Sequence, residues 1–145
     1  MEEILTLHEL LLAGDVNRAL AIVEEMEEMG LTAIRNKIRS YSKILLIHLI
    51  KQAVEKRSTR SWELSIQNSL DEIVNTNQRS ARSYYIKRDE LVTILEKVYG
   101  LALKAAAIEA FEGRYEAEEL AAMVDRSELL NQALTLIEAI EETAE

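Results

Sequence analysis

Residues 44–66, ILLIHLIKQAVEKRSTRSWELSI, contain the end of an apolar helix, a cationic turn and the only tryptophan. Apolar residues cover most of the circumference of the first half, which predicts a helix at the centre of a bundle. The polar residues Lys56 to Arg60 interrupt this pattern, and Thr59 or Ser61 can cap the helix that follows. The stretch therefore predicts two helices that meet at a cationic turn.

The composition of the whole chain favours helices. Its 145 residues include no Pro and only four Gly, and most of its common residues lose little freedom in a helix. Helical spacing of apolar residues predicts long helices near residues 32–57 and 80–112. We expect an all-α, single-domain bundle of five to seven helices over residues 1–145, with residues 114–145 as a C-terminal helical extension.

Glycines and capping residues mark the expected helix ends. Gly14 ends a first helix and Asp15 caps the second, whereas Gly30 ends the second and Thr32 caps the long third one. Gly100 lies inside the helix predicted near residues 80–112, where Gly costs ~1 kcal/mol relative to Ala. That cost predicts a kink or a close contact with another helix at Gly100.

Charge is distributed unevenly along the chain, whose formal net charge is −9. Residues 1–30 hold eight acidic side chains and one basic one, whereas residues 31–60 hold eight basic and one acidic. The overall acidity disfavours nucleic acid as a partner. No apolar run reaches the roughly 18 residues that a membrane span needs, and the chain has no Cys. We therefore expect a cytoplasmic protein without membrane contact.

Three segments in a fixed order resemble a known family. They are an acidic run at residues 23–30, the sequence LIHLIK at 46–51 and RSTRSW at 57–62. Together they resemble the cyanobacteria-rich domain-of-unknown-function family number twenty-nine, over about residues 10–110. The resemblance implies an all-helical fold and no established activity. In the acidic run, four residues form the structural part of the signature: Glu24, Glu25, Glu28 and Gly30.

The cationic turn is a candidate site for an anion or another small ligand. The free backbone donors of a helix N-terminus and the guanidinium groups of arginine both bind phosphate or carboxylate. The favoured interpretation is structural: His48 donates a hydrogen bond inside the core, and the cations pair with glutamates of residues 16–29. The candidate residues are His48, Lys51, Arg57, Arg60 and Trp62.

Neither histidine belongs to a metal-binding motif. Leu12, not a second histidine, follows His8 by four residues, and neither His8 nor His48 has a glutamate three residues before it. Zinc sites and helical di-iron sites need such pairs. We predict no metal, no cofactor and no catalytic residue.

Three functions remain open. The favoured one is a non-enzymatic protein-interaction module that self-associates as a dimer, since residues 44–54 and 102–110 offer more apolar surface than one core uses. The second is an enzyme that binds a small ligand or phosphate at the corner formed by His48, Arg57, Arg60 and Trp62. The third is a toxin-neutralising or nucleic-acid-associated accessory factor, which would use the glutamates of residues 24–28 or 112–119.

Overall fold

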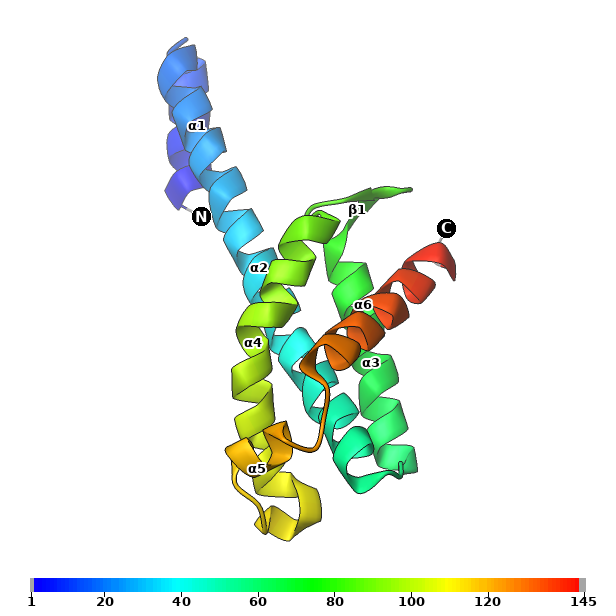
Figure 1. The fold of residues 1–145 in the computed structure, drawn as a ribbon. Coiled ribbons are helices and arrows are strands. Elements are labelled where there is room, and N and C mark those ends of the chain that lie inside the picture. The colour runs from blue at the N-terminus through cyan, green and yellow to red at the C-terminus, as the bar shows by residue number, and fades with distance from the viewer. Residues whose placement is uncertain (1, 144–145) are drawn as a thin grey trace. The chain divides into compact units, whose positions relative to one another are not determined.

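The computed structural model describes residues 2–143. It divides into two compact units, of which one ends at Arg35 and the other begins at Asn36. Apart from one short β-hairpin, the regular structure of the described residues is helical, so the predicted all-α class is confirmed (Figure 1). The α-helices are α1 (Glu2–Leu12), α2 (Val16–Glu55), α3 (Arg60–Asn77), α4 (Arg88–Glu109), α5 (Ala117–Ala121) and α6 (Arg126–Thr143).

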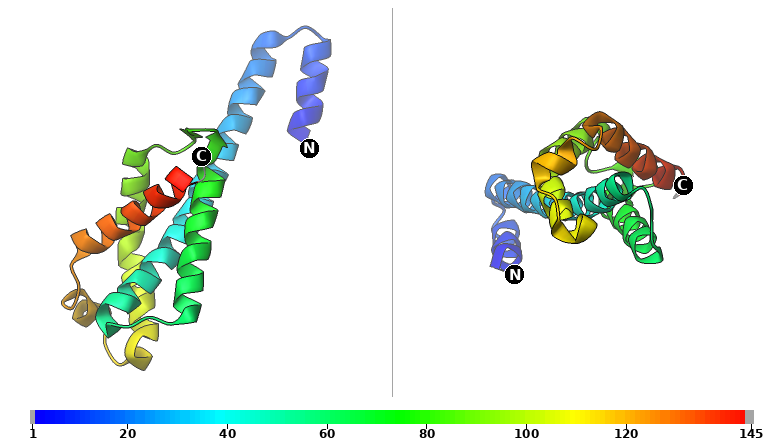
Figure 2. Two further views of the ribbon diagram at one scale, coloured as in Figure 1. Left: turned by 90° about the vertical axis from the view of Figure 1, so that its right-hand side faces the viewer. Right: turned by 60° about the horizontal axis from the view of Figure 1, so that its bottom comes forward.

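The first unit is a helical hairpin made of α1 and the first part of α2 (Figure 2). Gly14 turns the chain between the two helices at a φ of 77°, a conformation that suits glycine. The Asp15 carboxylate accepts a hydrogen bond of 3.2 Å from the backbone N–H of Arg18. The predicted interruption and cap are thus confirmed. Ala19 is the one buried residue among residues 2–35, so this unit has almost no core of its own.

The predicted helix end at Gly30 is wrong. Helix α2 continues through this residue, and the Thr32 hydroxyl donates to the Glu28 carbonyl at 3.0 Å instead of capping a new helix. Such a bond to the preceding turn lets threonine occupy a helix interior. The ~1 kcal/mol that Gly30 costs is too small to end a helix supported by regular turns on both sides.

The second unit packs α3, α4 and α6 around the C-terminal half of α2 (Figures 1 and 2). This half of α2 is central, as its apolar circumference predicts. Its fully buried side chains include those of Ile38, Leu45, Leu46 and Ile50. Helix α6 contacts α3 and α4, so the C-terminal residues pack within the same unit. The buried side chains of α6 are Leu129, Ala133, Leu134 and Ile137.

The connection between α3 and α4 contains a hairpin that the sequence does not predict. Strands β1 (Gln78–Ser80) and β2 (Ser83–Tyr84) pair antiparallel directly after α3. The buried Asn77 amide donates to the Ile86 carbonyl at 3.0 Å and accepts from the Ile86 N–H at 2.7 Å. These two bonds hold the chain out of helical conformation. Helix α4 therefore begins at Arg88 and not near residue 80.

Helix α4 continues through Gly100, and the close contact with another helix that we predicted there is wrong. Apart from its chain neighbours and the backbone of its own helix, a Cβ atom at this position would meet no atom within 4 Å. The small residues that follow do pack closely, because Ala102, Ala106 and Ala110 are fully buried. Helix α5 and the short helix η1 (Ala110–Gly113) both contact α4.

Candidate functional site

Lys51 and Trp62, both predicted site residues, meet in the second unit. The Thr59 hydroxyl accepts a hydrogen bond of 3.1 Å from the Trp62 N–H, so Thr59 caps α3 as predicted. This cap places the buried indole beside the last turns of α2, where Lys51 Nζ lies 4.6 Å from the ring centroid. An ammonium group is attracted to the negative face of an aromatic ring. The cap of α3 thus positions the ring that Lys51 contacts.

Carboxylates of the same unit hold the two cations of the site. Lys51 Nζ lies 3.1 Å from Glu109 Oε1, and Arg57 Nε lies 3.0 Å from Glu55 Oε1. The Arg57 guanidinium carbon also lies 4.7 Å from the Trp62 ring centroid. We expected glutamates of residues 16–29 as partners, and this prediction is wrong for both cations. A buried ammonium such as that of Lys51 needs a nearby carboxylate, and α4 supplies it.

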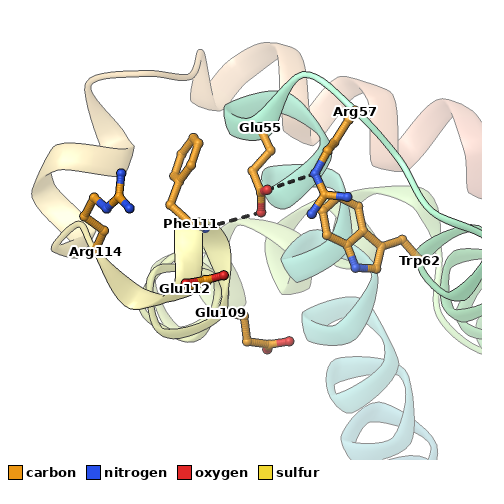
Figure 3. Close-up of a pocket in the computed structure, with 7 residues that line it drawn as sticks. All are labelled: Glu55, Arg57, Trp62, Glu109, Phe111, Glu112 and Arg114. Carbon is orange, nitrogen blue, oxygen red and sulfur yellow. Dashed lines mark hydrogen bonds and ion pairs between the residues drawn. The ribbon is translucent and has the colours of Figure 1, made fainter.

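Glu55 links the end of α2 to the turn after α4. Its Oε2 atom accepts a hydrogen bond of 3.4 Å from the Phe111 N–H (Figure 3). Phe111, Glu112 and Gly113 follow one another at φ values of 52°, 59° and 76°, all in the left-handed region. This conformation costs roughly 1–2 kcal/mol for each residue other than glycine. The surrounding contacts must therefore hold a strained turn at the edge of the site.

An open hollow of about 280 Å³ lies among these side chains (Figure 3). Three carboxylates and two guanidinium groups line it, and Glu55 already holds one of these guanidinium groups, that of Arg57. The lining thus carries more negative than positive groups, which disfavours phosphate. The lining residues are Glu55, Arg57, Trp62, Glu109, Phe111, Glu112 and Arg114. Glu55 and Glu109 are not among the predicted site residues: Glu55 is two residues from Arg57 and could have been found locally, whereas Glu109 is 58 residues from Lys51 and no local pattern indicates it.

The structure does not join His48 and Arg60 to this hydrogen-bonded cluster. Arg60 is exposed, and its side chain forms no hydrogen bond or ion pair within residues 2–143. His48 is half-buried, and its Nδ1 atom has no partner among the described residues. Its Nε2 atom also forms no hydrogen bond to a described residue, so the predicted hydrogen bond of His48 is wrong. Burial lowers the pKa of His48, as does Lys51, whereas Glu109 acts in the opposite direction.

A second hollow of about 410 Å³ lies between α4 and α6. The Arg126 guanidinium crosses this region, where it donates to the Glu96 carbonyl at 3.3 Å and lies 5.3 Å from the Tyr99 ring centroid. Burial raises the pKa of Tyr99. No group of three or more His, Cys, Asp or Glu in the described part of the chain is placed to hold a metal ion.

The fold and the site define an all-α bundle protein in which the buried ammonium of Lys51 pairs with a carboxylate of the same chain, that of Glu109. The chain belongs to the family described as domain of unknown function DUF29, whose sequence model matches residues 15–138. The resemblance inferred from residues 10–110 is confirmed, and the match continues into α6. Comparisons with curated proteins and with solved structures give no match. Between residues 2 and 143, no helix has the length and apolar character needed to cross a membrane.

Proposed function

We propose that this protein is a non-enzymatic helical module that binds other proteins and self-associates. The exposed apolar surface of the first unit carries this proposal. Leu12 and Met29 keep 76% and 62% of their surface accessible. Clusters of exposed apolar side chains mark interaction surfaces in proteins that do not aggregate. The exposed large apolar residues of this hairpin are Ile4, Leu5, Leu11, Leu12, Val16, Leu20, Val23 and Met29.

This surface differs from the one that the sequence suggested. Most of the apolar stripes of residues 44–54 and of the alanines in residues 102–110 are buried inside the second unit, where they form its core. Residues 2–35 instead contain the single buried residue Ala19. A hairpin with so small a core gains stability when a partner covers its apolar side chains.

The alternative functions have less support. An anion at the cationic corner would have to displace Glu109 from Lys51 or Glu55 from Arg57, and would leave a carboxylate beside it. An accessory factor that neutralises a basic protein would bind that protein through the acidic hairpin. Such a factor is itself a protein-interaction module, so this alternative is a special case of the proposed function. The cytoplasmic location stays a prediction from the cysteine-free composition.

Light scattering over a concentration series tests the proposal on the full chain. We expect a mass that rises above the 16.5 kDa of one chain, and we expect Leu12→Ser with Leu20→Ser to lower it. Leu64→Ser is the matched control, because Leu64 is 71% exposed but lies on α3. Circular dichroism checks that helix content is unchanged. A mass of one chain at every concentration, with no protein retained from native lysate, would contradict the proposal.

A further inference from the structure

We infer that the apolar and acidic side of the hairpin docks on a cationic side of α2 in a second copy of the chain. This inference rests on the proposed function and names its partner and both surfaces. The acidic face consists of Val16, Leu20, Val23, Glu24 and Glu27. The basic face consists of Arg39, Lys43, Ile44 and Ile47.

The acidic face is a continuous side of a helix. Val16, Leu20, Val23 and Glu27 are spaced by four, three and four residues, which places them on one side, and Glu24 flanks them. All five side chains are exposed. The side chains of Glu24 and Glu27 form no hydrogen bond or ion pair within the described residues. Apolar groups beside unpaired carboxylates fit a partner that is both apolar and cationic.

The basic face is the side of α2 that the second unit leaves uncovered. Ile44 is 38% exposed and Ile47 is partly buried, whereas Leu45 and Leu46 between them are fully buried. Arg39 and Lys43 lie one turn apart and form no ion pair within residues 2–143. Lys37 is not part of this face, because it lies on another side of α2 from Arg39 and Lys43 and is 3.3 Å from Glu72 of α3. This face therefore offers apolar surface beside Arg39 and Lys43, whose side chains have no carboxylate partner among the described residues.

Charge complementarity selects a second copy as the occupant. Two hairpins that docked on each other would bring together segments with eight acidic side chains and one basic side chain in residues 1–30. Like charges placed together across an interface repel each other and weaken binding. Residues 31–60, with eight basic side chains and one acidic, are the complementary segment. Every copy carries both faces, so each molecule can donate one and accept the other.

Charge reversal tests this arrangement. The first variant carries Glu24→Lys and Glu27→Lys, and the second carries Arg39→Glu and Lys43→Glu. We expect each variant alone to associate at least about tenfold more weakly than the native chain in light scattering, because its two faces then have like charge. A 1:1 mixture of the two variants, and a chain with all four changes, should associate again because opposite charges face each other. Thermal unfolding by circular dichroism confirms that each variant is folded.

Three outcomes would overturn the inference. Association of both variants at the native level would exclude these faces while leaving self-association by another surface, and hence the proposed function, intact. Weak association of the mixture would show that the two faces do not meet each other. A native chain that stays a monomer at every concentration would overturn both the inference and the self-association that it rests on. Leu64→Ser serves again as the control for a change outside both faces.

Discussion

The Lys51 ammonium lies 3.1 Å from the Glu109 carboxylate and joins the end of α2 to the end of α4. The pair is asymmetric, because 7% of the Lys51 side chain is exposed and 50% of the Glu109 side chain. Without Glu109 a buried cation would lose its partner, whereas without Lys51 the carboxylate would still be hydrated. The two partners therefore contribute unequally to stability.

We predict that Glu109→Gln lowers the free energy of unfolding by about 1–3 kcal/mol, since it leaves Lys51 buried beside a neutral amide. Lys51→Met keeps an apolar stem against Trp62 and should cost less. In the Lys51→Met background, Glu109→Gln should have little effect. Urea unfolding of the four proteins measures this double-mutant cycle. Additive effects would show that the ion pair contributes nothing.

Trp62→Ala should lower the free energy of unfolding by about 3–5 kcal/mol, because it removes a buried ring and leaves a cavity. Trp62 is 9% exposed and contacts both Lys51 and Arg57. Trp62→Phe should cost less, since it keeps an aromatic ring in place. Leu64→Ala is the control, with an expected change within about 0.5 kcal/mol. A small effect of Trp62→Ala on the unfolding midpoint would argue against a structural role of the indole.

Two glycines should respond to alanine in opposite directions. Gly113 has a φ of 76°, and a Cβ there would lie 3.0 Å from the Ile108 carbonyl oxygen, so Gly113→Ala should destabilise by at least about 1–2 kcal/mol. Gly100 lies in the interior of α4 with no atom near its absent Cβ, so Gly100→Ala should stabilise by ~1 kcal/mol. Thermal unfolding of both variants checks the pair. Equal signs would contradict the left-handed turn after α4.

Stability should fall below about pH 6.5 through His48. Burial and Lys51 lower the pKa of His48 in the folded state, so the unfolded state binds its proton more readily. The contribution is therefore fully present above the ordinary histidine pKa and is lost as the pH falls through the lowered value. His48→Gln should flatten this part of the curve of unfolding free energy against pH. Burial also raises the pKa of Glu141. Because this carboxyl titrates in both the native protein and the His48→Gln variant, its contribution cancels in the difference between their two curves.

Local patterns predicted much of the fold. The helical period of apolar residues identified α1, α3 and the C-terminal half of α2. The caps at Asp15 and Thr59 lie where their residue types predict. Local rules failed at Gly30, because a weak helix former does not end a long helix. They also failed at the β-hairpin, where Asn77 bonds to the backbone of Ile86 nine residues away.

The helical class, the cationic turn and the family could all be predicted, because each depends on patterns among residues that are close along the chain. The carboxylate that pairs with Lys51, and the apolar side chains that stay exposed, depend instead on how helices far apart in the sequence pack together. Lys51 and Glu109 are 58 residues apart, and no pattern within a helix indicates that α4 ends beside α2. The apolar spacing of residues 16–23 is likewise that of a core helix. The apolar residues with this spacing are exposed because no other element among residues 2–35 covers them.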